Sequence, residues 1–126
     1  MLIRYKRSYE KIAMGLLSFI PSEKEIKSLL QTIHTYEESS DWQLFLWKKG
    51  EDIVGEIGIH FQNDHQATIE HISVNPSFRT EGIGKEMILA LKKMLGEAIE
   101  LTPSATIEPY FESCMKKTDD MEAGNK

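Results

Sequence analysis

Hydrophobic residues recur with helical spacing in several stretches of the chain. Residues 26–36 carry apolar side chains at positions i, i+3, i+4 and i+7, which predicts an amphipathic helix ending near Glu38. Residues 83–95 show the same spacing, and Gly96 directly after them is typical of a helix C-terminus. Shorter helices are predicted at residues 9–19 and 110–116.

Apolar and polar residues alternate in the remaining regular segments, as expected of strands with one buried face. The segment Lys49-Gly50-Glu51 is a short turn with the glycine that hairpins favour, so it predicts an antiparallel pair on either side. A later strand, helix and strand in succession require a parallel crossover. The expected strands are residues 2–7, 43–47, 52–60, 67–74 and 98–101.

The order of these elements, β-α-α-β-β-β-α-β-α, predicts one α/β (α+β) domain with a mixed, mostly antiparallel sheet flanked by helices. The length of 126 residues fits a single domain, which we place at residues 1–117. Residues 118–126 are polar and are expected to form a disordered tail.

Composition and charge exclude several classes of protein. The net charge of −5 gives no basic surface for nucleic acid and favours a cationic small substrate. No apolar stretch approaches the roughly 20 residues that cross a bilayer, and no secretory signal is recognisable, so we expect a cytoplasmic protein. Cys114 is the one cysteine, which excludes an intrachain disulfide, and no Cys/His cluster has the spacing of a metal site.

The loop between the strand at 67–74 and the helix at 83–95 suits an anionic ligand. Free N–H groups and the positive end of a helix together bind phosphate. Glycines let the backbone approach the anion, and basic side chains add charge. A purely structural turn is the alternative interpretation of the glycines. The residues concerned are Arg79, Thr80, Glu81, Gly82, Ile83, Gly84 and Lys85.

This phosphate-binding loop differs from two common types. A P-loop would need Gly at position 79 and Ser or Thr at position 86, where the chain has Arg79 and Glu86. The dinucleotide fingerprint would need a third glycine where Met87 stands.

The run from Ile69 to Gly84, IEHISVNPSFRTEGIG, resembles the acetyl-CoA-binding motif of GCN5-related N-acetyltransferases (GNAT). The resemblance implies a cleft between two parting strands, 67–74 and 98–101, in which acetyl-CoA or coenzyme A lies. The backbone of Ile72, Ser73 and Val74 would pair with the pantetheine arm, and the N–H groups of residues 79–84 would hold the pyrophosphate. Residues 2–21, 44–48 and 71–77 also resemble small acetyltransferase-like proteins of bacterial riboflavin operons.

N-acetylation of a small amine needs a base, because an amine with a lysine-like pKa of about 10.4 is protonated at neutral pH. In relatives a carboxylate or histidine at the position of Glu70 often serves, so Glu70 is the leading candidate. Strict alternation would put Glu70 on one face of the strand with Thr68 and Ile72, and His71 on the other with Ile69 and Ser73. His71 and His60 are further candidates, with structural roles as the alternative for each.

The leaving thiolate needs an acid, which in many relatives is a tyrosine on the last helix. Phe111 stands at that position here, and Tyr110 lies about 100° round the helix, so Tyr110 could serve only if the helix is rotated. Cys114 is expected to be a small buried hydrophobe. A CoA-binding regulatory or interaction protein without turnover is therefore the alternative function.

We expect the strand pair that often completes the GNAT fold to be missing after the last helix. This would leave one sheet edge uncovered, which a second copy of the chain could cover as a homodimer.

Overall fold

The computed structural model describes the backbone of residues 1–124 and the side chains of residues 1–116. Its main elements are β1 (Leu2–Arg4), α1 (Glu10–Leu17), α2 (Ile26–Glu38), β2 (Trp42–Lys49), β3 (Asp52–Asn63), β4 (Gln66–Val74), α3 (Ile83–Leu95), β5 (Glu100–Pro103) and α4 (Glu108–Gly124). Short 3-10 turns, η1 (Arg7–Tyr9), η2 (Pro21–Glu23) and η3 (Pro76–Phe78), lie in the connections.

The five strands form one sheet in sequence order. Three neighbouring pairs are antiparallel, and β4 and β5 are parallel, joined through α3. This confirms the mixed, mostly antiparallel sheet and the predicted order of the main elements.

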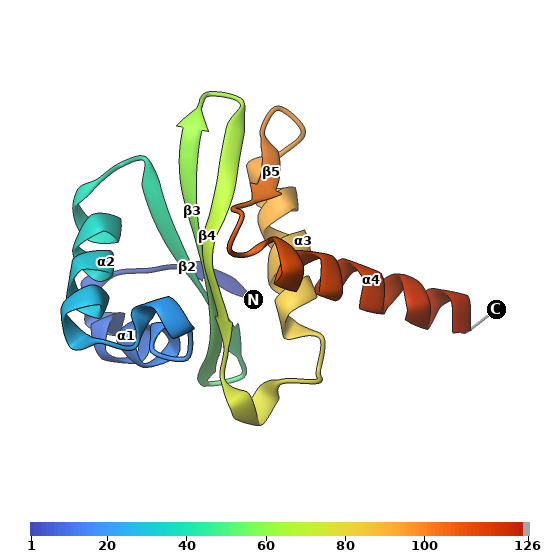
Figure 1. Ribbon diagram of the computed structural model, residues 1–126, viewed down its shortest axis with the longest axis horizontal. Helices are drawn as coiled ribbons and strands as arrows, with labels where there is room; N and C mark the ends of the chain where they lie inside the picture. The colour runs from blue at the N-terminus through green and yellow to red at the C-terminus, as the bar shows by residue number, and fades with distance from the viewer. Residues whose placement is uncertain (125–126) are drawn as a thin grey trace.

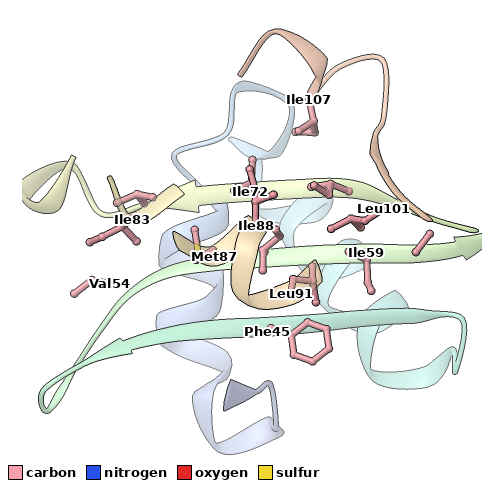
Figure 2. Packing of buried hydrophobic residues seen from close by; sticks show 14 residues of the cluster. Phe45, Val54, Ile59, Ile72, Ile83, Met87, Ile88, Leu91, Leu101 and Ile107 are labelled. Atoms are coloured by element: carbon pink, nitrogen blue, oxygen red, sulfur yellow. The ribbon is translucent and has the colours of Figure 1, made fainter. Parts of the chain in front are cut away.

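The helices cover the sheet from both sides (Figure 1). One buried cluster joins α1 and α2 to the sheet through residues such as Leu17, Ile33 and Leu44. The other joins α3 to the opposite face through residues such as Ile69, Met87 and Leu91, as Figure 2 shows for α3 and the strands beneath it. Because alternate side chains of a strand point to opposite faces, β2, β3 and β4 supply residues to both layers.

Several element boundaries differ from those the pattern predicts. The last strand is Glu100–Pro103 rather than 98–101, and its first N–H donates to the carbonyl of His65 (2.8 Å). Helix α4 continues past Lys116 to Gly124, so its backbone includes much of the stretch for which we expected a tail. Residues 125 and 126 lie outside the described residues.

The largest difference concerns the alternation of β4. The register with β3 changes between Gly58, which pairs with His71, and Ile59, which pairs with Ile69. Glu70 is therefore the extra residue of a β-bulge. As a result Ile69 and Ile72 both enter the α3 cluster, whereas strict alternation placed them on opposite faces.

Candidate functional site

Strands β4 and β5 part halfway along β4. Their pairing runs from Gln66 to Ile69, and the last bond on this side joins the N–H of Ser104 to the carbonyl of Ile69 (3.0 Å). Beyond this point β4 continues to Val74 without β5 beside it. This leaves the backbone of residues 70–74 as a short free edge inside an otherwise paired sheet.

The two faces of this free edge are fixed by different helices. Ile72 and Val74 are buried in the α3 cluster. Ser73 points the other way, and its hydroxyl donates to the carbonyl of Leu16 in α1 (2.7 Å). Because contacts with α3 on one face and α1 on the other hold these side chains, the free edge is a rigid backbone surface.

The free edge leads through η3 to the N-terminus of α3. Gly82 is the N-cap residue, with φ +78 and no side-chain cap, and a side chain there would meet nothing within 4 Å. Thr80 also has a positive φ of 82, which is unusual for a β-branched residue. The first N–H groups of a helix have no partner within the helix, so this open end fits an anion.

The basic side chains near this loop have partners within the protein. The guanidinium of Arg79 donates through Nε to the carbonyl of Val74 (3.1 Å) and lies 5.8 Å from the ring centre of Phe19. Lys49, the last residue of β2, forms an ion pair with Glu81. Arg79 thus stabilises the end of β4 through this hydrogen bond. Lys85, at the start of α3, is half-buried.

The carboxylate of Glu70 lies at the point where the strands part. It accepts a hydrogen bond from the Thr68 hydroxyl (2.8 Å). Burial raises the pKa of Tyr36 and lowers that of His71; the charge of Glu70 adds to the first shift and opposes the second, so Glu70 lies near both residues on the α2 side. The bulge brings Glu70 and His71 to one region, although alternation predicts opposite faces.

A chain of hydrogen bonds connects His71 to the helices. Its Nδ1 lies 2.6 Å from the Tyr36 hydroxyl in α2, and its Nε2 lies 3.2 Å from Oε1 of Glu23 in η2. The other oxygen of Glu23 accepts from the Thr32 hydroxyl (2.9 Å). Burial lowers the pKa of His71 despite the opposing effects of Glu23 and Glu70, so the ring is neutral at pH 7.

The Tyr36 hydroxyl reaches His71 because position 58 has no side chain. A Cβ at Gly58 would lie 2.0 Å from this oxygen. Burial, followed by the charges of Glu56, Glu70 and Glu23, raises the pKa of Tyr36 well above its usual value. Tyr36 therefore stays protonated, and neutral His71 accepts its proton at Nδ1 while donating from Nε2 to Glu23.

Glu56 is a buried acid beside this chain. It lies two residues before Gly58 on β3, pairs with Ser73, and is 0% exposed. Neither of its carboxyl oxygens has a hydrogen-bond partner among the described residues. Burial raises its pKa well above the usual value, so the carboxyl is protonated over a wide pH range.

Tyr110 and Phe111, which are neighbours on α4, point to different parts of the protein. The Tyr110 hydroxyl lies against the first turn of α3, 2.4 Å from where a Cβ of Gly84 would be. Burial and the neighbouring Cys114 raise its pKa. Phe111 instead packs against the α3 cluster, and the centre of its ring lies 5.7 Å from Lys92 Nζ. Tyr110 therefore faces the loop that Phe111 does not reach.

Sequence patterns did not single out Glu23, Tyr36, Glu56 or Gly58. Tyr36 fitted the apolar face of the helix predicted at residues 26–36. A glycine inside a strand often marks close approach by another group, so Gly58 was the available signal.

Two kinds of site are not found in the part of the chain that the structure describes. Among the side chains that the structure describes, those of residues 1–116, no group of three or more His, Cys, Asp and Glu residues is placed to hold a metal ion. No helix within residues 1–124 has the length and apolarity required to span a membrane.

Comparison with known proteins gives consistent matches. Residues 12–110 match the sequence model of the acetyltransferase (GNAT) family. An uncharacterized N-acetyltransferase in the lysA 3′ region of Bacillus methanolicus is 53% identical over 114 residues, which cover 90% of this chain and 94% of that protein.

Solved structures share the fold at low sequence identity. Aminoglycoside N-acetyltransferase AAC(6′)-Iy in complex with CoA has a TM-score of 0.71 at 14% identity, over 94% of this chain and 84% of that one. A transcriptional regulator from Bacillus halodurans has a TM-score of 0.68 at 15% identity, over 96% and 90%. With the parted strands and the open helix end, the family match leads to one conclusion: this chain belongs to the GNAT acetyltransferase family.

Proposed function

We propose that this protein is an acetyl-CoA-dependent N-acetyltransferase that acts on a small amine. The observation that carries the proposal is the continuous path from the free β4 edge at residues 70–74 to the open N-terminus of α3. A pantetheine arm offers amide groups that can pair with a strand edge, and a pyrophosphate suits a helix N-terminus. The two features occur in the order in which these groups follow each other in CoA.

The proposed CoA contacts come mainly from the backbone. Ile72, Ser73 and Val74 pair with the pantetheine arm. The pyrophosphate is held by N–H groups of Arg79, Thr80, Glu81, Gly82, Ile83 and Gly84, with Lys85 adding charge. AAC(6′)-Iy, which has the same fold, was solved with CoA and with a CoA-linked aminoglycoside analogue.

The proposed reaction transfers the acetyl group from sulfur to nitrogen. Glu70 accepts a proton from the ammonium group of the acceptor, directly or through a water molecule. The freed amine attacks the thioester carbonyl, and the backbone N–H of Val74 stabilises the oxyanion. Tyr110 then donates a proton to the departing thiolate and regains one from the newly acetylated nitrogen; its raised pKa keeps it protonated at neutral pH.

The acceptor is proposed only by chemical class, as a small amine. The acidic groups Glu23 and Glu70 near the parted strands favour a cation. A narrower proposal is that the chain belongs with RibT, the acetyltransferase-like protein of bacterial riboflavin operons. That proposal rests on the similarity of residues 2–21, 44–48 and 71–77, and comparing growth of a deletion strain with and without riboflavin would test it.

A second candidate function is CoA binding without turnover. Phe111 occupies the position where many relatives carry their acidic tyrosine, which favours this alternative. In that case calorimetry would show CoA binding, whereas no amine would be acetylated.

The assay for the main proposal is thiol release from acetyl-CoA with a panel containing an aminoglycoside, spermidine, lysine and ethylamine. We expect turnover with at least one amine and a reduction of about 10²-fold in kcat for Glu70→Gln. Binding of acetyl-CoA without turnover would support the second candidate. Full activity of Glu70→Gln would remove Glu70 as the base.

Two further proposals concern the surroundings of the protein. We propose a cytoplasmic location, where acetyl-CoA is available, which fractionation of cells would test.

We also propose a homodimer that covers β5, an edge strand with a hollow of about 710 Å³ beside it. Light scattering after size-exclusion chromatography would test the dimer, and a monomer at all concentrations would contradict it.

A further inference from the structure

The hydrogen-bonded chain Glu23–His71–Tyr36 lies on the α2 side of the point where β4 and β5 part. His71 belongs to the unpaired part of β4, since the pairing with β5 ends at Ile69. Tyr36 and Glu23 come from α2 and η2, 35 and 48 residues away in sequence. Three separate segments thus converge beside the place where the acetyl group would be transferred.

The Glu23–His71–Tyr36 chain is largely shielded from water, and its hydrogen bonds are oriented so that His71 can take up a proton. The side chains of His71 and Glu23 are 13% and 10% exposed, so their interaction is little weakened by water. Neutral His71 has its Nε2–H directed at the Glu23 carboxylate and its Nδ1 lone pair directed at the Tyr36 hydroxyl. A proton taken up at Nδ1 would make an imidazolium that Glu23 stabilises directly, as in hydrolase triads.

We propose that Glu23, His71 and Tyr36 form a second proton-accepting route for the acceptor amine, in parallel with Glu70. This proposal rests on the proposed function. An ammonium N–H proton passes to the Tyr36 oxygen as the Tyr36 proton passes to His71 Nδ1. The C–N bond then forms and the C–S bond breaks. The thiolate receives its proton from Tyr110, which regains one from the substituted nitrogen, and His71 finally releases its proton to water.

Each residue has a distinct part in this route. In the proposed route the hydroxyl of Tyr36, a residue that is 5% exposed, contacts the amine when the acceptor binds, and His71 stores the proton. Glu23 is a positioning residue that acts through His71, and Thr32 holds Glu23. The titratable groups that face the chain are Glu70 on β4 and Glu56 on β3, both of which act on Tyr36. Gly58 is required because any side chain there would displace the Tyr36 hydroxyl.

A purely structural role would also explain a buried hydrogen-bonded chain, so the test must separate the two. Ethylamine and 2,2,2-trifluoroethylamine are similar in size, but the ammonium form of the second is far more acidic. At pH 7.5 trifluoroethylamine is largely unprotonated and needs no base before attack. Loss of a proton-accepting route should therefore slow the acetylation of ethylamine selectively, whereas a disturbed fold should slow the acetylation of both amines.

The experiment measures thiol release from acetyl-CoA with both amines, in a Glu70→Gln background where the proposed route is the remaining one. Adding Tyr36→Phe should lower kcat/KM for ethylamine by about 10²-fold and that for trifluoroethylamine by no more than about twofold. Adding Glu23→Gln should move the acid limb of the ethylamine pH profile to lower pH, because His71 loses the carboxylate that favours its charged form. Tyr5→Phe is the matched control, since it removes another hydroxyl that contacts the end of α2.

Four outcomes would contradict the proposal. If Tyr36→Phe lowers kcat/KM equally for both amines, or leaves the ratio of the two kcat/KM values as in the wild-type protein, the chain is structural. Either result would leave the proposed acetyltransferase function intact. Acetyl-CoA binding by the wild-type protein without turnover of either amine would reject the enzymatic function and the route together. As a second readout, nitrogen NMR of His71 should show the Nε2–H tautomer and a lower pKa in Glu23→Gln; an unchanged pKa would also contradict the proposal.

Discussion

The Tyr110 hydroxyl lies in the space where a side chain at Gly84 would begin, with 2.4 Å between this oxygen and a Cβ at position 84. This contact joins α4 to the first turn of α3, directly behind the proposed pyrophosphate loop. Gly84 is therefore needed here for packing of α4, besides any role in approaching a ligand.

Gly84→Ala should destabilise the protein even though alanine is the better helix former. The gain in helix propensity is about 1 kcal/mol, whereas overpacking against Tyr110 costs about 1–3 kcal/mol. Chemical denaturation should show a net loss, which Tyr110→Ala should relieve in the double variant. An equal loss in the presence and absence of the Tyr110 side chain would show that the contact is unimportant.

Gly82→Val should weaken CoA binding at least about tenfold, because a branched side chain would enter the space proposed for the pyrophosphate and strain a residue with φ +78. Gly96→Ala is a suitable control. Gly96 has φ +82, is equally open, and lies at the other end of α3. Calorimetry should find normal CoA affinity for Gly96→Ala. If both variants lose affinity alike, the effect comes from backbone strain and not from the loop.

Tyr110→Phe should lower kcat by about tenfold or more without changing CoA affinity, if Tyr110 donates the proton to the thiolate. Since burial and Cys114 raise its pKa, Tyr110 remains protonated in mildly alkaline solution, and it should cause no loss of activity there. Phe111→Tyr in the Tyr110→Phe background should not restore kcat, because position 111 faces Lys92 and the apolar cluster. Restored activity would mean that α4 lies differently in the active protein.

How far these sites can be predicted from sequence depends on whether their residues are neighbours in the chain. The loop 79–85, the strand before it and the helix after it form one continuous segment, so its pattern predicted the element order and the open helix end. The direction in which Tyr110 faces depends on the rotation of α4 about its axis, which no local pattern fixes.

The β-bulge at Glu70 was the main obstacle. Counting by twos along β4 assumes a regular ladder, and one extra residue exchanges the faces of every position beyond it. The Glu23–His71–Tyr36 chain was equally hidden, since it joins segments that only the folded sheet brings together. In the sequence, Tyr36 fitted the apolar face of the helix predicted at residues 26–36, and no pattern connected it with Glu23 or His71.

Glu56 makes the stability of this protein depend on pH in a definable way. A carboxyl group whose pKa is raised in the folded state contributes stability below its unfolded pKa of about 4.3, and this contribution is lost as the pH rises through the folded value. The unfolded chain ionises freely at neutral pH, whereas the folded chain keeps Glu56 protonated or buries an unpaired charge. His71 also titrates in the unfolded chain near pH 6.5, but it does so in the wild-type protein and in a Glu56 variant alike, so a comparison of the two isolates the slope due to Glu56.

Glu56→Leu should therefore raise the free energy of unfolding by about 1–3 kcal/mol at pH 8, because it removes a buried polar group without a partner. Its stability should also vary less with pH between 5 and 8 than that of the wild-type protein. Glu51→Leu, an exposed change on the β2–β3 turn, is the control and should have little effect. A marked loss of stability in Glu56→Leu would mean that the carboxyl group has a partner in solution. Loss of acetyl transfer without loss of stability would instead place Glu56 in the chemistry beside Tyr36.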